Sequence, residues 1–127
     1  MARTDVQREM KEMFGEVITF IDEIPDQFID AEWDLIKRVQ FGETLIPNKY
    51  KELIGLGVAA ATKCRYCVLF HTASAKLFGA TDEEVEEAVH YTKLIVGWST
   101  YINGMQVDYE QFKAQVDRVV EHVTSAA

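Results

Sequence analysis

Hydrophobic residues recur along this chain at intervals of three and four positions almost from end to end, which is the pattern of amphipathic helices. No segment shows the sustained alternation of a β-strand. The only two prolines, Pro25 and Pro47, stand where new helical patterns begin, a position that proline tolerates well. The sequence therefore predicts an all-α fold of six or seven helices, in a single domain over residues 1–127.

The first two predicted helices run from about Thr4 to Asp22 and from Pro25 to Gly42, each with an apolar stripe. A third helix over residues 48–62 is rich in glycine and alanine, and such small residues let a neighbouring helix pack closely. A fourth helix over residues 64–78 is expected to end at Gly79 in a left-handed cap.

The remaining helices begin after a clear start signal. Thr81 followed by Glu84 is typical of a capping box, and the acidic residues around them suit the positive end of the helix dipole. Gly97 and Gly104 are expected to interrupt the region after this helix. A last helix is predicted over about residues 108–124. The sequence shows no internal repeat, linker or low-complexity segment.

Composition adds limits on partners and compartment. The chain has 127 residues, 48% of them hydrophobic, and a formal charge of −8. This length can bury a core without disulfides or a structural metal. The acidic balance, with scattered lysines and arginines, argues against a nucleic-acid partner. We see no secretory signal and no apolar run of about 20 residues, so we expect no membrane partner and a cytoplasmic location, where cysteine pairs are mostly reduced and serve redox or metal chemistry.

The chemically informative segment holds Cys64, Cys67 and His71. On a helix these three positions fall within an arc of about 60°, so both thiols and the imidazole share one face. A Cys-x-x-Cys pair at a helix N-terminus can form a disulfide, and the helix dipole lowers the thiol pKa there. The spacing indicates dithiol redox chemistry.

Glu52 precedes this segment and needs a turn to reach it. An unbroken helix would place Glu52 roughly 18 Å from the first cysteine and on another face. We expect the chain to reverse near Thr62 and Lys63, with Thr62 as N-cap of the cysteine helix. In that hairpin Glu52 lies opposite His71, across helices about 8–10 Å apart. A carboxylate that orients a histidine beside a thiol activates a nucleophile, so we predict a relay from Glu52 to His71 to Cys67.

The spacing Glu-x11-Cys-x-x-Cys-x3-His, formed here by Glu52, Cys64, Cys67 and His71, resembles the AhpD-like alkyl hydroperoxidase branch of the carboxymuconolactone decarboxylase superfamily. The resemblance covers about residues 43–90. It implies an all-helical subunit that assembles into homotrimers or homohexamers and acts as a thiol-dependent peroxidase or disulfide reductase. The substrate would be a small peroxide or disulfide, the reductant an external dithiol, and no bound cofactor or metal is expected.

The resemblance also implies roles for the site residues. Cys67 would be the attacking thiolate and Cys64 its disulfide partner, with His71 and Glu52 relaying the proton. The residues by themselves leave the order of the cysteines open, because Cys64 lies nearer the helix N-terminus, where a thiolate is favoured. The best-known peroxidases of this branch carry a histidine immediately before the second cysteine, where this chain has Tyr66. This departure lowers the peroxidase activity we expect and leaves dithiol–disulfide exchange intact.

Three alternatives use the same residues differently. The lactone decarboxylases of the superfamily resemble this chain in fold but lack the paired cysteines. A metal could instead be held by Cys64, Cys67 and His71, with Glu52, although one Cys-x-x-Cys and one histidine supply only three ligands on a rigid face. In the third alternative, two buried cysteines and a core histidine have only a structural role.

Other apolar residues point to a pocket and to assembly. Tyr66 and Phe70 are expected to line a substrate pocket or the core beside the cysteines. Several helices, the second above all, carry apolar residues on more than one face. A subunit of this size cannot cover all of that surface alone, so we expect a homo-oligomer.

Overall fold

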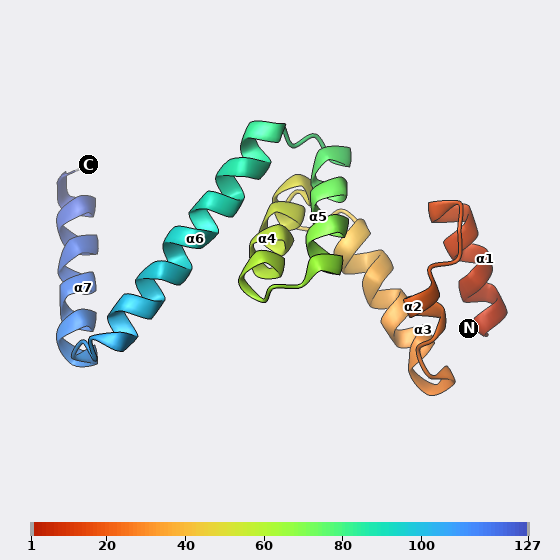
Figure 1. Ribbon diagram of the computed structural model, residues 1–127, viewed down its shortest axis with the longest axis horizontal. Coiled ribbons are helices and arrows are strands. Elements are labelled where there is room, and N and C mark those ends of the chain that lie inside the picture. Colours follow the sequence, from red (N-terminus) through yellow and green to blue (C-terminus); the bar gives the residue numbers. More distant parts are fainter. Residues whose placement is uncertain (1, 127) are drawn as a thin grey trace.

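The computed structural model describes residues 2–126, and these residues are almost entirely helical and form no strand. Seven α-helices and one π-helical turn follow one another in an extended arrangement (Figure 1). In chain order they are α1 (Arg3–Phe14), α2 (Thr19–Asp22), α3 (Asp26–Leu35), the π-helical turn η1 (Ile36–Phe41), α4 (Asn48–Ala61), α5 (Arg65–Leu77), α6 (Asp82–Gly104) and α7 (Tyr109–Ala126). The predicted all-α class and the predicted number of helices are confirmed.

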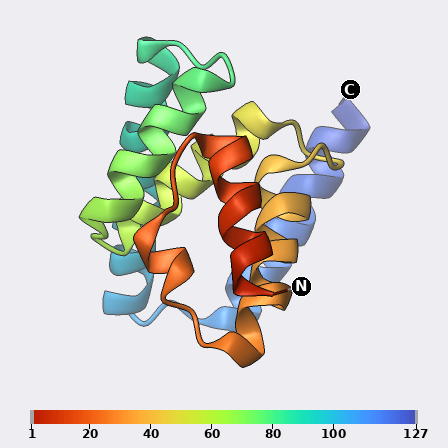
Figure 2. The ribbon, with the colours of Figure 1, turned by 90° about the vertical axis from the view of Figure 1, so that its right-hand side faces the viewer.

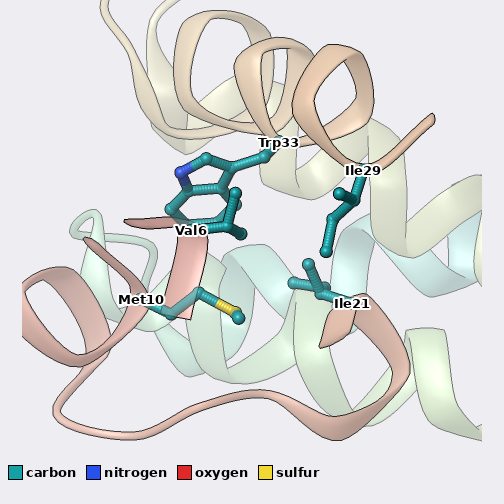
Figure 3. Close-up of a cluster of buried hydrophobic side chains, with 5 residues drawn as sticks. All are labelled: Val6, Met10, Ile21, Ile29 and Trp33. Atoms are coloured by element: carbon teal, nitrogen blue, oxygen red, sulfur yellow. The ribbon is translucent and has the colours of Figure 1, made fainter. Parts of the chain in front are cut away.

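The first three helices enclose the main hydrophobic cluster. Figure 2 looks onto this group from the right-hand side of Figure 1, and Figure 3 shows its side chains converging from α1, α2 and α3. Trp33 is fully buried, and its Nε1–H donates to Glu9 Oε2 at 2.6 Å, which satisfies the one polar group of the ring. The buried members are Val6, Met10, Ile21, Ile29 and Trp33.

The prediction of one helix from Thr4 to Asp22 is wrong, because the chain breaks after α1. Gly15 adopts a φ of +80°, and its N–H donates to the Lys11 carbonyl, which closes the helix with a left-handed cap. The short helix α2 begins only at Thr19. This reversal brings Ile21 back against α1, where it joins the buried cluster.

The second predicted helix has the expected extent but not a uniform geometry. Pro25 immediately precedes α3, and Pro47 immediately precedes α4, as predicted. After Leu35 the helix widens into η1, a π-helical turn that the hydrophobic pattern does not reveal. Its last residue, Phe41, packs its ring against Phe14 of α1 at a centroid distance of 5.1 Å.

Helices α4, α5 and α6 pack against one another, and α4 carries the glycine- and alanine-rich run of the sequence. A Cβ atom at Gly57 would lie 2.8 Å from Thr92 Oγ1, so α6 approaches α4 closely because position 57 has no side chain. Lys49 forms an ion pair with Glu84 at 2.8 Å near the start of the same two helices. These two contacts show that α4 and α6 run parallel. The turn between α4 and α5, together with the Glu52–His71 contact, makes these two helices an antiparallel hairpin.

The chain reverses at Thr62 and Lys63 as predicted, but the predicted N-cap is wrong. Thr62 ends α4 instead, and its Oγ1–H donates back to the Val58 carbonyl at 2.9 Å. Lys63 then takes a φ of +58°, and Cys64 becomes the N-cap of α5. Because the Thr62 hydroxyl is hydrogen-bonded to the preceding helix, it does not cap the next one.

Helix α6 begins as predicted and ends later than predicted. Gly79 has a φ of +96°, and Thr81 and Glu84 form the reciprocal capping box. The expected break at Gly97 does not occur, because α6 continues to Gly104. A Cβ at Gly97 would meet nothing within 4 Å, so this glycine marks neither a turn nor a close contact.

Helix α7 stands apart from the other elements of the described chain (Figure 1). Neither α6 nor α7 has a buried side chain. The apolar stripe of α7 is therefore exposed, and it includes Phe112, Val116, Val119, Val120 and Val123. No helix among the described residues is long and apolar enough to cross a bilayer.

Candidate active site

The centre of the α4–α5 hairpin holds a hydrogen-bonded carboxylate and imidazole. His71 Nδ1–H donates to Glu52 Oε2 at 2.7 Å, as the predicted hairpin requires. Glu52 is only 3% exposed, whereas the His71 side chain is 22% exposed. Because Nδ1 is occupied by the carboxylate, Nε2 is the ring nitrogen left to accept a proton. A histidine oriented by a carboxylate in this way can act as a general base.

Gly55 makes room for this base, a role that the sequence interpretation did not assign to it. A Cβ atom at Gly55 would lie 2.6 Å from both Cε1 and Nδ1 of His71. The imidazole therefore lies directly on the backbone of α4, three residues beyond Glu52. Any larger residue at position 55 would displace the ring from its carboxylate.

The two cysteines lie at the start of α5 and are joined to each other. A disulfide connects Cys64 and Cys67, whose Cα atoms are 5.3 Å apart. The Cys67 backbone N–H donates to Cys64 Sγ at 3.2 Å, so this sulfur caps the helix. Both residues are half-buried. The predicted ability of this pair to bridge is thus present in the fold.

The last link of the predicted relay is not formed in this oxidised state. Among the described residues, no hydrogen bond joins the His71 ring to either sulfur. Cys67 lies one helical turn before His71, and its sulfur is held in the disulfide. The contact between His71 and the Cys67 thiol remains a prediction for the reduced protein.

Aromatic rings border the imidazole on its other side. The Phe70 ring packs edge-to-face against His71 at 5.3 Å and against Phe41 at 6.0 Å. Phe41 comes from η1, and sequence periodicity could not place it here because the π-helical turn changes the register. Tyr66 is 73% exposed and lies beneath the Arg65 guanidinium at 5.3 Å from the ring centroid. Of the two predicted pocket residues, only Phe70 contacts the histidine.

Ion pairs anchor the opposite end of the hairpin. The hydrogen bond from Lys49 holds the pKa of Glu84 below its ordinary value, and Glu84 in turn raises the pKa of Lys49. Lys76 likewise lowers the pKa of Asp82 through a contact of 2.8 Å. These pairs fix the start of α6 against α4 and α5.

The surroundings of the cysteines bear on the metal-binding alternative. In the part of the chain that the structure describes, no three His, Cys, Asp or Glu side chains converge as metal ligands would. The two sulfurs that such a site would need are bonded to each other.

Comparisons with known proteins identify the family and the fold of the chain. The model of the carboxymuconolactone decarboxylase family matches residues 22–108. "Uncharacterized protein 4 in cox locus" of Paracoccus denitrificans is 33% identical over 61 residues, which are 48% of this chain and 55% of that protein, so the match spans about half the length of the relative.

A solved structure shows the same fold over most of the chain. The alkylhydroperoxidase AhpD core from Rhodospirillum rubrum superposes with a TM-score of 0.75 at 24% identity, covering 87% of this chain and 85% of that one. The family match spans more than half of the sequence, and the helices follow the AhpD core. The chain therefore belongs to the carboxymuconolactone decarboxylase family and has the AhpD-like fold.

Proposed function

We propose that this protein is a thiol-dependent oxidoreductase that cycles Cys64 and Cys67 between dithiol and disulfide. The observation that carries the proposal is the buried Glu52 carboxylate bonded to His71, one turn from the cysteine pair on the same helix. Substrates are small peroxides or disulfides, and an external dithiol restores the reduced enzyme. In this proposal the side chains of the site supply the chemistry without a cofactor.

The proposed reaction begins with the reduced protein. His71 Nε2 accepts the proton of the Cys67 thiol, while Glu52 stabilises the resulting imidazolium through Nδ1–H. The Cys67 thiolate attacks one sulfur of a substrate disulfide, forms a mixed disulfide and releases the other half as a thiolate, which takes the proton from His71. Cys64 then attacks Cys67 Sγ, which releases the second substrate thiol and leaves the Cys64–Cys67 bridge.

A peroxide follows the same path with a different leaving group. The Cys67 thiolate attacks one oxygen and becomes a sulfenic acid, and the other oxygen leaves as an alcohol or as water. Cys64 condenses with the sulfenic acid, which releases water and forms the same disulfide. Because Tyr66 occupies the position before Cys67, no second imidazole is available there to protonate the departing oxygen. We therefore expect slower turnover with peroxides than with disulfides.

Variants that retain only one of the two cysteines test which cysteine attacks the substrate first. The Cys64→Ser variant retains Cys67, one turn from His71, and should react with iodoacetamide with an apparent pKa well below the ordinary value of about 8.5. The Cys67→Ser variant retains Cys64, which lies at the helix N-terminus but two helical turns before His71. If the Cys67→Ser variant reacts faster at pH 7, Cys64 is the nucleophile and the proposed order is wrong.

The relay is tested on the Cys64→Ser background. His71→Ala should slow alkylation of Cys67 at pH 7 by about 10- to 100-fold and return its pKa toward about 8.5. Glu52→Gln should cause a smaller loss in the same direction. His90 is exposed on α6, so His90→Ala is the matched control and should leave the profile unchanged. An unaltered pH profile in the His71 variant would contradict the relay.

The family name itself favours a second candidate, a lactone decarboxylase-like reaction. Such a reaction needs no pair of thiols, so the double variant Cys64→Ser/Cys67→Ser separates the two proposals. Complete loss of peroxide and disulfide turnover supports the oxidoreductase. Lactone decarboxylation that survives in the double variant supports the alternative. Metal analysis of the reduced protein, in which the sulfurs are free, tests the metal-binding alternative, and we expect well under one zinc ion per chain.

We further propose that the exposed stripe of α7 is covered by a second copy of this chain, in a homotrimer or homohexamer. Within residues 2–126 the stripe packs against no other element, although it is long enough to bury several valines. Val119→Asp should shift the mass measured by light scattering toward the monomer. Ser125→Asp, on the polar face of α7, adds the same charge and should leave the assembly intact. A wild-type protein that is monomeric at micromolar concentration would overturn this proposal.

A further inference from the structure

The charge around the cysteine pair differs from that of the rest of the protein. The chain contains 21 Asp and Glu residues, yet none occurs from Leu53 to Thr81, the stretch that forms most of α4, the turn and α5. The carboxylate nearest in sequence before this stretch is Glu52, which is buried and bonded to His71. The end of the hairpin that carries the disulfide is therefore free of acidic residues of its own.

Two cations flank the first cysteine. Lys63 and Arg65 are both exposed, and within residues 2–126 neither forms an ion pair with a carboxylate. Arg65 is held over the exposed ring of Tyr66, between the two cysteines in sequence. Many other cations of the chain are neutralised, namely Arg3, Arg8, Lys37, Arg38, Lys49, Lys76 and Lys113.

The neighbouring helix adds no compensating charge at this end. Lys49 pairs with Glu84, and Gly57 faces Thr92. The two helices therefore run in the same direction with a constant offset in residue number. The C-terminal end of α4 therefore lies beside the part of α6 that follows Thr92. From Ala88 to Val107 the chain has no Asp or Glu. The acidic start of α6 lies at the opposite end of the hairpin, where Lys49 and Lys76 neutralise part of its charge.

We propose that the Cys64–Cys67 pair acts preferentially on disulfides that carry carboxylates close to the sulfur atoms, and that Lys63 and Arg65 determine this specificity. The inference rests on the proposed dithiol–disulfide exchange. The reaction oxidises the protein dithiol to the Cys64–Cys67 disulfide and reduces one anionic disulfide to two anionic thiols. The negative charge that develops on the leaving sulfur falls beside the same two cations.

The size of the effect follows from Coulomb attraction at an exposed site. A cation and an anion about 7 Å apart in water change a rate or binding constant by about two- to threefold. Two cations acting on one substrate carboxylate therefore give about four- to tenfold at low ionic strength, and salt above about 0.5 M screens most of this effect. In a protein of formal charge −8, the remaining surface opposes anions, so the local cations decide the preference.

The experiment compares reduced wild-type protein with three probe disulfides in stopped flow. The probes are 5,5′-dithiobis(2-nitrobenzoate), which is dianionic, 4,4′-dithiodipyridine, which is neutral, and cystamine, which is cationic. The readout is the ratio of the anionic to the neutral rate constant, because that ratio cancels changes in thiol pKa that affect both probes. We expect Lys63→Gln/Arg65→Gln to lower this ratio about four- to tenfold and to raise the relative rate of cystamine.

Lys11 provides the matched control, because it is an exposed cation on α1 without an ion pair in the described chain. Lys11→Gln should leave the ratio unchanged, and two titratable thiols per chain and an unaltered circular dichroism spectrum establish that each variant is folded. If the double variant retains the wild-type ratio, or if Lys11→Gln lowers it equally, the inference is overturned while the exchange activity stands. If no probe reacts faster than with free glutathione, the proposed function itself fails.

Discussion

Replacement of Gly55 by alanine tests whether the histidine is held by the backbone of α4. The new Cβ would lie 2.6 Å from two atoms of the His71 ring, a distance that real contacts do not allow. Overpacking of this kind costs about 1–3 kcal/mol. Displacement of the ring also breaks a hydrogen bond to a charged group, worth about 1.5–3 kcal/mol. Alanine recovers about 0.5–1 kcal/mol through its better helix propensity. We expect Gly55→Ala to lower the free energy of unfolding by about 2–5 kcal/mol.

A double-mutant cycle isolates the contact with the ring. In the His71→Ala background the clash is absent, so Gly55→Ala should become stabilising by about 0.5–1 kcal/mol. Gly97→Ala is the control for propensity alone, because a Cβ there meets nothing within 4 Å. Urea unfolding of the oxidised proteins, followed by circular dichroism at one protein concentration, measures all four corners of the cycle. Equal costs of Gly55→Ala with and without the imidazole would refute the reasoning.

Two further predictions concern contacts outside the site. The hydrogen bond from Lys37, and to a smaller extent the one from Trp33, hold the pKa of Glu9 below its ordinary value of 4.5. Ionised Glu9 therefore stabilises the fold above pH 4.5, and this contribution is lost as the pH falls through the lowered pKa. Urea unfolding from pH 6 to pH 3 should therefore show a smaller acid-side loss for Glu9→Gln than for wild type; parallel curves would contradict the assignment. Thr81→Ala should cost about 1 kcal/mol because it removes the cap of α6, and thermal unfolding that matches wild type would show that the capping box contributes nothing.

Local signals in the sequence were sufficient for much of the fold and for part of the site. Prolines and the capping box placed the starts of α3, α4 and α6 because each acts through its own backbone geometry. The contact between Glu52 and His71 followed from counting residues on both sides of one turn, and the structure confirms it. Helical periodicity makes such counting reliable as long as both helices are regular.

The parts that could not be predicted depend on tertiary contacts. Gly15 breaks a helix and Gly97 does not, and no local pattern separates them, because one adopts a positive φ and the other remains helical. Thr62 is a residue type that is favoured at N-caps, but its hydroxyl bonds to the preceding helix. Phe41 reaches the ring of Phe70 only because η1 is a π-helical turn. The need for glycine at position 55 comes from the His71 ring of α5, a contact that the local sequence does not reveal.

Different contacts hold the proposed base and the cysteine pair, and this separation bears on the proposed mechanism. A carboxylate buried as deeply as Glu52 is costly unless it is paired, so its burial favours retention of the histidine contact. That contact requires only Glu52, His71 and the space left at Gly55, and none of these atoms takes part in the disulfide. The cysteines lie instead at an exposed turn, where one sulfur serves as a helix cap. Oxidation and reduction can therefore change the turn while the imidazole keeps its orientation, which the proposed function requires of a base that serves both halves of a redox cycle.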